Sequence, residues 1–158
     1  MDVVICAWAE VEEWMEQREF DFVISIGASQ SAPPPPLDAP PASLRVCRLE
    51  FYDTLDGGPD GPHEYHVLAL IDFCEEIIEA DGAALAHCEM GVSRSAAAAL
   101  ILLAVAMGPG RERASVGMLE TLEGGDRARP NARIIALADE ILGRDGDLLS
   151  AMLQVYGA

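Results

Sequence analysis

The sequence predicts one α/β domain, residues 1–158, built as a three-layer sandwich in which helices flank a central sheet of four or five strands. Two features of the pattern indicate this fold. Short apolar runs typical of buried strands alternate with longer segments in which apolar residues recur at helical spacing, and after the last such run the pattern is helical. A chain of 158 residues has the length of one domain with a substantial core, and no repeat or domain boundary is visible in it.

The expected strands are short runs rich in β-branched and other apolar residues. The second ends at Gly27, where its alternation stops. In the third, Arg48 and Glu50 alternate with Leu49 and Phe51, which gives the strand two different faces. The predicted strands are residues 3–6, 20–26, 44–51 and 83–87.

The expected helices show apolar residues at intervals of three and four, as Val67, Leu70, Ile71 and Cys74 do. The segment after the fourth strand is instead an unbroken run of small and large apolar residues, which predicts a buried helix. Glycine-rich breaks separate the last helices. The predicted helices are residues 10–19, 63–80, 96–106, 112–122, 131–142 and 147–155.

Two long loops interrupt this pattern. Residues 29–43 contain runs of four and two prolines, which favour a stiff surface connector over a ligand for a proline-recognising module. Residues 52–62 are acidic and glycine-rich. His63 and His66, at the start of the following helix, are expected to lie at the surface. Because they have no partners at metal-ligand spacing, no metal site is predicted.

Composition limits the compartment and the partners. The formal net charge is −17 and the chain contains no lysine, so its surface repels nucleic acid and anionic lipid. No apolar run reaches the length of a membrane span, and the first residues lack the basic region of a signal peptide. Four scattered cysteines favour reduced thiols in a cytosol. We expect a cytoplasmic monomer that binds no cofactor, nucleic acid or membrane.

The stretch from Ala86 to Ser95 holds the residues best suited to carry chemistry. An apolar strand leads into it and a helix leads out, so Cys88 ends the strand and Arg94 begins the helix. A loop so placed directs backbone N–H groups inward at a helix N-terminus, whose partial positive charge favours tetrahedral anions such as phosphate. The guanidinium of Arg94 adds a planar, charged fork that can hold two phosphate oxygens.

The same surroundings activate Cys88. A helix N-terminus and a nearby cation can lower a thiol pKa to roughly 3.5–7.5, which leaves mostly thiolate at neutral pH. Gly91 suits a turn with positive φ, and the hydroxyl of Ser95 can stabilise the thiolate when it becomes the leaving group. His87 is expected to be buried and to fix the loop by hydrogen bonds. Together these residues predict nucleophilic catalysis of phosphoryl transfer.

The pair His87-Cys88, five further residues and the pair Arg94-Ser95 resemble the phosphate loop of the protein tyrosine phosphatases. Within it, Gly91 to Ser95 is similar to the dual-specificity branch, and residues 131–148 are similar to small bacterial members. The resemblance implies the dual-specificity phosphatase fold, Cys88 as nucleophile and no cofactor. It also implies that phosphate oxygens are held by Arg94 and by the backbone amides of Glu89, Met90, Gly91, Val92, Ser93 and Arg94.

Phosphoryl transfer to sulfur also needs a proton donor for the leaving oxygen, and a carboxyl group on the acidic loop can supply it. The resembled family carries an aspartate in this loop. Asp53 and Asp56 lie 35 and 32 residues before the cysteine, so spacing leaves both open, with Asp60 as a third candidate. Asp53 is favoured because it directly follows the strand and forms an Asp-Thr pair similar to that of some dual-specificity members.

A late segment, Arg127 to Asn131, is similar to the family's Arg…Pro-Asn sequence. The resemblance implies that the asparagine supports the phosphate loop from behind. Asn131 also stands at the start of a predicted helix, where an asparagine side chain can cap the first turn. Both roles can hold together.

The predicted function is hydrolysis of phosphate monoesters, with phosphotyrosine favoured and phosphoserine, phosphothreonine or a small phosphate ester left open. The partner would be a phosphorylated protein or such an ester. Glu89 and the absence of lysine from the loop disfavour polyphosphorylated inositides. Two alternatives are a catalytically weak module that binds phosphate or phosphoproteins and a rhodanese-type sulfurtransferase. The second has less support, since the rhodanese loop usually lacks the His-Cys…Arg-Ser frame.

Overall fold

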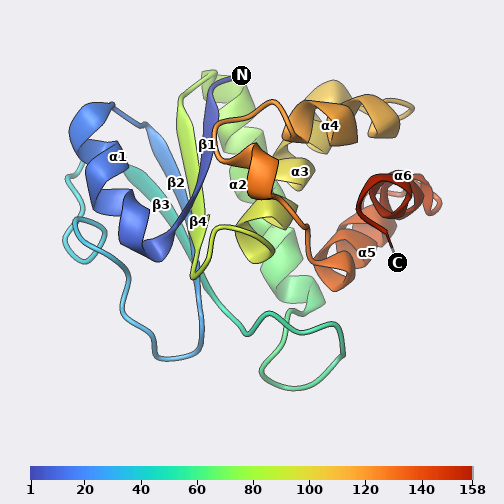
Figure 1. Cartoon of the computed structure of the whole chain (residues 1–158), viewed down its shortest axis with the longest axis horizontal. Helices are drawn as coiled ribbons and strands as arrows, with labels where there is room; N and C mark the ends of the chain where they lie inside the picture. The colour runs from blue at the N-terminus through green and yellow to red at the C-terminus, as the bar shows by residue number, and fades with distance from the viewer. Residues whose placement is uncertain (158) are drawn as a thin grey trace.

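The four predicted strands form one parallel sheet in the computed structural model, which describes residues 1–157. The order across the sheet is β1-β4-β2-β3, so β4 lies in the interior between β1 and β2 (Figure 1). The predicted α/β sandwich is confirmed, and the described residues contain four strands rather than five. The strands are β1 Val3–Ala7, β2 Phe22–Gly27, β3 Arg45–Glu50 and β4 Ala84–Cys88.

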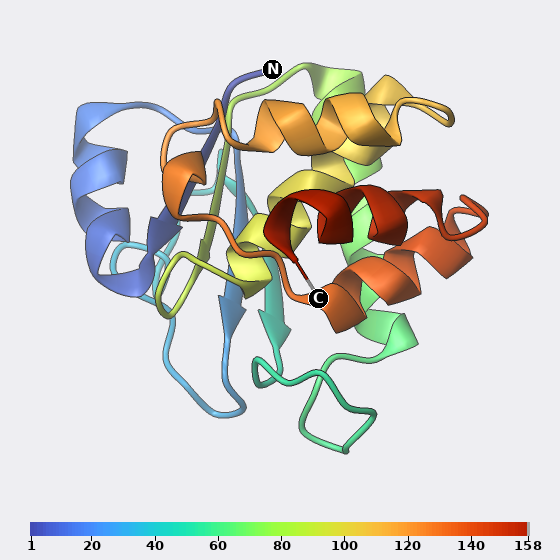
Figure 2. The same ribbon diagram turned by 45° about the vertical axis from the view of Figure 1, so that its right-hand side comes forward.

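Helices cover both faces of the sheet unequally. The short helix α1 covers one face, where it packs together with the apolar residues of the proline-rich loop. The longer helices lie on the other face, as Figures 1 and 2 show. The helices are α1 Val11–Gln17, α2 Glu64–Ala80, α3 Arg94–Met107, α4 Glu112–Leu119, α5 Ala132–Ile141 and α6 Asp147–Tyr156.

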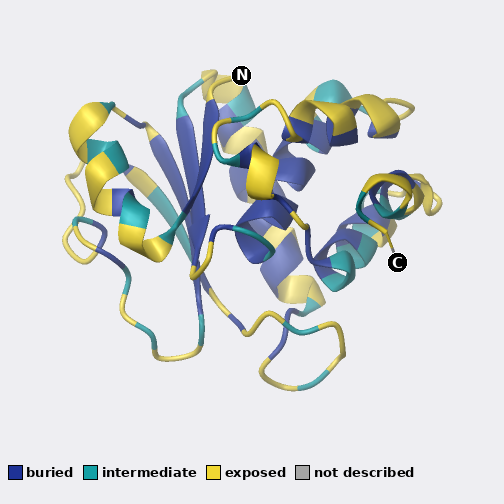
Figure 3. Ribbon diagram, viewed as in Figure 1, coloured by how far each residue is buried: buried dark blue, intermediate teal, exposed yellow. Residues whose placement is uncertain are grey.

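The central helix of the larger layer is α3. All its residues from Arg94 to Ala104 are buried, as the apolar run predicts (Figure 3). It packs against the sheet and against α2, α4 and α5. Helical hydrogen bonding starts earlier than predicted, because the amide of Ala97 donates to the carbonyl of Ser93 at 3.0 Å. The first turn of α3 therefore lies directly beside the loop after β4. Within residues 1–157 no helix is long and apolar enough to cross a membrane.

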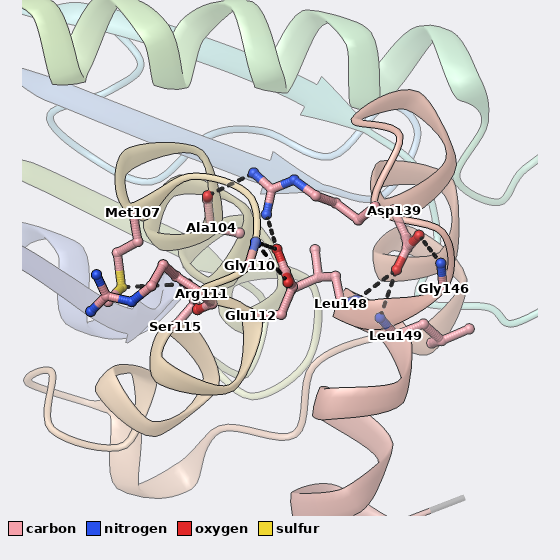
Figure 4. Close-up of polar contacts among 11 residues, drawn as sticks. Ala104, Met107, Gly110, Arg111, Glu112, Ser115, Asp139, Gly146, Leu148 and Leu149 are labelled. Atoms are coloured by element: carbon pink, nitrogen blue, oxygen red, sulfur yellow. Dashed lines mark hydrogen bonds and ion pairs between the residues drawn. The ribbon is translucent and has the colours of Figure 1, made fainter.

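Buried polar contacts join the last three helices (Figure 4). Arg144 pairs with the buried carboxylate of Glu112 and donates from Nη2 to the carbonyl of Ala104 at 2.9 Å. Asp139 accepts from the amides of Gly146 and Leu148, both at 2.7 Å, and so caps the first turn of α6. These bonds tie α4 and α6 to the end of α3, and thereby stabilise the helix that begins at the candidate site.

His66 contradicts the expectation that both histidines at the start of α2 lie at the surface. It is buried, and its ring centroid lies 4.8 Å from that of Phe51. The reason is its position on the helix, four residues before Leu70, which places it on the face that packs into the core. Nδ1 accepts a hydrogen bond from the amide of His63 at 3.0 Å, and burial lowers the pKa of His66.

Candidate active site

The site residues gather at the carboxyl end of β4. Cys88 is the last residue of this interior strand, a loop of five residues follows, and α3 begins at Arg94. The loops after β1 and β3 leave the same edge of the sheet (Figure 2). In open parallel sheets ligands bind beyond the carboxyl ends of the strands, and this is such a place.

Surrounding segments hold the loop by its carbonyl groups. The amide of Trp8 donates to the carbonyl of Glu89 at 3.1 Å, and the amide of Arg129 donates to that of Val92 at 2.8 Å. By contrast, no amide of residues 89–93 donates to a backbone carbonyl within the described chain. Because its carbonyls bond outward, the loop keeps its N–H groups available for an anion.

Gly91 has φ +71°, which confirms the predicted left-handed turn. A side chain here would meet the backbone of β1, because its Cβ would lie 2.6 Å from the carbonyl carbon of Cys6 and 2.7 Å from the amide nitrogen of Ala7. The close approach of the loop to β1 therefore requires glycine at this position.

Cys88 is buried at the base of this loop, with Sγ 3.1 Å from the hydroxyl oxygen of Ser95. Burial alone would raise the pKa of the thiol. It is outweighed by hydrogen bonds from the hydroxyl and amide of Ser95 and the amide of Gly91, and by the charge of Arg94, so the pKa of Cys88 lies below its usual value. Burial raises the pKa of Cys6 to about 12, that of Cys47 to about 11, and that of Cys74 further still.

Cys88 is therefore expected to react first with peroxide or iodoacetamide at neutral pH, because the thiolate is the reactive form. Peptide mapping after brief treatment should find modification at Cys88 and little at Cys6, Cys47 or Cys74. Modification of Cys74 ahead of Cys88 would contradict the activation described above.

The guanidinium of Arg94 is buried and anchored at the end of β3. Its Nη1 donates to the carbonyl of Phe51 at 2.8 Å. Within residues 1–157, Nε and Nη2 of Arg94 make no hydrogen bond to another protein atom. Neither nitrogen is one of the fully buried polar atoms that lack a hydrogen-bond partner. Two donors of the fork are thus available for the oxygens of an anion in the loop.

Of the three candidate acids, the structure brings Asp53 into contact with the loop after β4, residues 89–93. Its Oδ1 accepts from the hydroxyl of Ser93 and from Nδ2 of Asn131, both at 2.7 Å. Asp56 is exposed, and its Oδ1 accepts from the amide of Gly58 at 3.0 Å within its own turn. The side chain of Asp60 is also exposed. Asp53 is exposed as well, so its hydrogen bonds to Ser93 and Asn131 are what distinguish it from the other two candidates.

Asn131 joins the two loops and also caps α5, so both interpretations of this residue hold. Its Oδ1 accepts from the backbone amide of Ile134 at 3.0 Å, and the backbone amide of Asn131 donates to the carbonyl of Ser93 at 3.2 Å. The side-chain bond to Asp53 was not expected from the sequence, because the two residues are 78 positions apart.

His87 is fully buried behind Cys88, as predicted. Its Nδ1 lies 3.2 Å from the carbonyl oxygen of Cys88, and its Nε2 lies 2.7 Å from the hydroxyl of Ser25. Burial, with smaller effects from the charges of Arg48 and Arg94, lowers the pKa of His87 to about 4. Sequence reasoning missed Ser25 and Arg48, although a polar residue inside an apolar strand is a signal for such a contact.

Comparisons with known proteins find similarity in structure and not in sequence. No protein-family model and no curated protein matches the chain. Human DUSP28 superposes with a TM-score of 0.63 at 18% identity, covering 96% of this chain and 94% of that one. The human tyrosine phosphatase-like serine/threonine/tyrosine-interacting protein gives 0.66 at 16% identity, covering 88% and 89%. Tk-PTP in its active form gives 0.64 at 18% identity, covering 91% and 93%. The chain therefore has the dual-specificity phosphatase fold.

Proposed function

We propose that this protein is a phosphatase that hydrolyses phosphate monoesters through a cysteinyl-phosphate intermediate. The observation that carries the proposal is one cluster at the end of β4. An activated Cys88 lies 3.1 Å from Ser95, Arg94 starts the adjoining helix, and Asp53 is bonded to Ser93 of the same loop. The fold shared with solved phosphatases supports the same conclusion.

In the first step the thiolate of Cys88 attacks phosphorus, and the bond from phosphorus to the ester oxygen breaks. The loop amides and the fork of Arg94 bind the three equatorial oxygens, whose charge they stabilise in the transition state. Asp53 gives its proton to the departing oxygen, so the product leaves as an alcohol or phenol and Asp53 becomes a carboxylate.

In the second step water attacks the cysteinyl-phosphate, and the carboxylate of Asp53 takes a proton from it. The bond from sulfur to phosphorus breaks, and the sulfur leaves as a thiolate. The hydroxyl of Ser95 stabilises that thiolate by donating a hydrogen bond to it and keeps its own proton; the two atoms are already 3.1 Å apart. Inorganic phosphate leaves, and Cys88 and Asp53 return to their starting protonation states.

Phosphotyrosine is the favoured substrate class because exposed apolar side chains follow the strands that end around the loop. Trp8 comes after β1, Met90 lies in the loop itself, and Tyr52 and Leu55 come after β3. Such side chains suit the aromatic ring of an aryl ester better than a short alkyl ester. Glu89, exposed in the loop, disfavours densely phosphorylated ligands.

The proposal is tested by rapid mixing of the protein with an aryl phosphate. A burst of phenol stoichiometric with protein, followed by steady turnover and by phosphate release, is the expected result. A phosphotyrosine peptide should be hydrolysed faster than its phosphoserine counterpart. Phosphate binding without turnover would instead support the binding module, and transfer of sulfur from thiosulfate would support the sulfurtransferase.

Arg94→Lys is expected to lower both affinity and rate although the charge is kept. A lysine ammonium is a point charge and cannot make two parallel hydrogen bonds to phosphate. The measurement is kcat/KM for an aryl phosphate together with Kd for inorganic phosphate. Unchanged kinetics would show that Arg94 does not contact the phosphoryl group.

A further inference from the structure

Three polar residues form a row across the sheet, on the face that packs against α1. Strand pairing sets Ser25 of β2 opposite Arg48 of β3 on one side and opposite His87 of β4 on the other. The preceding residues on this face, Val46, Val23 and Leu85, belong to or pack against the apolar cluster under α1. The polar row therefore lies at the carboxyl end of that layer, directly behind the start of the phosphate loop.

Hydrogen bonds run continuously along this row. Nη1 of Arg48 lies 2.9 Å from the hydroxyl oxygen of Ser25, and that oxygen lies 2.7 Å from Nε2 of His87. On its other side the histidine ring reaches the carbonyl oxygen of Cys88, 3.2 Å from Nδ1. Ser25 and His87 are fully buried, so no solvent competes for these bonds.

The chemistry of the two ends fixes the direction of the two outer bonds, and the protonation state of the ring then fixes the middle one. A guanidinium only donates, so the Ser25 oxygen accepts from Arg48 and keeps one lone pair and its single hydrogen for the bond with Nε2. A carbonyl only accepts, so Nδ1 carries the hydrogen that faces Cys88. The neutral imidazole that donates from Nδ1 and accepts at Nε2 satisfies both neighbours at once. A doubly protonated ring would take the second lone pair of the Ser25 oxygen, and the hydroxyl hydrogen would then lose the Nε2 acceptor that it has beside the neutral ring.

We propose that Arg48, acting through Ser25, holds the His87 ring in the neutral form that carries its hydrogen on Nδ1, and so fixes the first peptide of the phosphate loop. Arg48 and Ser25 are positioning residues, since both act on the loop through the His87 ring. The effect on turnover rests on the proposed function, whereas the state of the ring does not.

Other contacts hold Arg48 in this role. Its Nη2 donates to the carbonyl of Ser31 at 2.8 Å and to the Ser31 hydroxyl oxygen at 3.0 Å. The same Nη2 lies 3.5 Å from Oε2 of Glu50, with which it forms an ion pair. The charged groups that act on His87 are Arg48 from β3 and Arg94 from α3, and both oppose a second proton on the ring. From β1, Cys6 lies opposite His87, and burial raises the pKa of its thiol to about 12, so it stays neutral. The opposing influence is the carbonyl of Cys88, which favours a ring that donates.

Nitrogen NMR of the imidazole rings tests the proposal directly on the unaltered protein. The chain has three histidines, so assignment is simple. His87 should show a hydrogen on Nδ1, a bare Nε2, and no titration between about pH 5.5 and 8, well above its low pKa. A His87 ring protonated on Nε2, or one that titrates near pH 6.5 as a free histidine does, would overturn the proposal.

Arg48→Met is the decisive variant, and Arg45→Met is its matched control. Arg45 lies on the same strand but is exposed and pairs with Glu76 at 2.9 Å. Arg48→Met removes the donor to the Ser25 oxygen and a positive charge that lowers the pKa of His87, so His87 should titrate at higher pH or gain hydrogen on Nε2. Arg48→Lys keeps a charged donor and should restore most of the native spectrum. The Arg45 variant should not differ from the native protein.

The same variants connect the ring to turnover. Loss of one buried hydrogen bond in the row should lower kcat/KM by roughly 3- to 10-fold in Arg48→Met and in Ser25→Ala, with little change in the Arg45 control. A native His87 spectrum in Arg48→Met would overturn the proposal. If no protein in the series hydrolyses phosphate esters, the proposed function fails while the NMR spectra still decide the state of His87. Should Arg48→Met not fold, the native and Arg48→Lys spectra decide it.

Discussion

Replacing Cys88 with serine is expected to reduce turnover by roughly 10³-fold or more, because the attacking group is lost. A serine hydroxyl stays protonated at the pH where the Cys88 thiol is ionised. The hydrogen bonds from Ser95 and Gly91 that favour the thiolate cannot supply the missing ionisation. The loop amides and Arg94 are unchanged, so phosphate should bind with nearly native affinity.

Steady-state kinetics and phosphate titration of the Cys88→Ser protein measure these two effects separately. The matched control is Cys47→Ser, since this thiol lies within β3 and has a raised pKa. It should keep native kinetics. Retention of more than a few per cent of activity in the Cys88 variant would exclude covalent catalysis through this residue.

The fold and the part of the site between β4 and α3 could be predicted, because the patterns that indicate them are local in the sequence. Each strand is a short apolar run, and each predicted strand is present within a few residues of its expected bounds. Cys88, Gly91, Arg94 and Ser95 lie within one strand-loop-helix unit, so their relative positions follow from that unit alone. The left-handed turn at Gly91 and the burial of His87 follow from it as well.

The rest of the site depends on which segments meet in space. Asp53 and Asp56 are three positions apart in the same acidic loop. They are distinguished by the hydrogen bonds that Asp53 alone accepts from Ser93 and Asn131. The row behind the loop depends on the register of neighbouring strands, which sets Ser25 beside Arg48. Neither contact has a signal in spacing along the chain, because each joins residues brought together by the sheet or by α5.

Replacing Asp53 with asparagine is expected to slow hydrolysis of a phenyl phosphate by roughly 10²–10⁴-fold, which is the usual contribution of general acid catalysis to the rate. An amide cannot give a proton to the leaving oxygen. Asparagine has the same shape and can still accept from Ser93 and Asn131, so the loop should keep its position. The loss should shrink for an ester whose leaving group is already acidic, because that oxygen needs no proton.

The pH profile then separates Asp53 from the other two acids. Activity should rise through the depressed pKa of Cys88 as the thiolate forms, in the native protein and in every acid variant alike. It should fall at higher pH as the general acid loses its proton, and this fall should disappear in Asp53→Asn. Asp56→Asn and Asp60→Asn are the controls, since within residues 1–157 neither side chain hydrogen-bonds to the loop after β4, whereas Asp53 does. If the fall disappears instead in Asp56→Asn, Asp56 is the acid and the contact with Ser93 only positions the loop. If every variant keeps the fall in activity at higher pH, none of these three carboxyl groups protonates the leaving group.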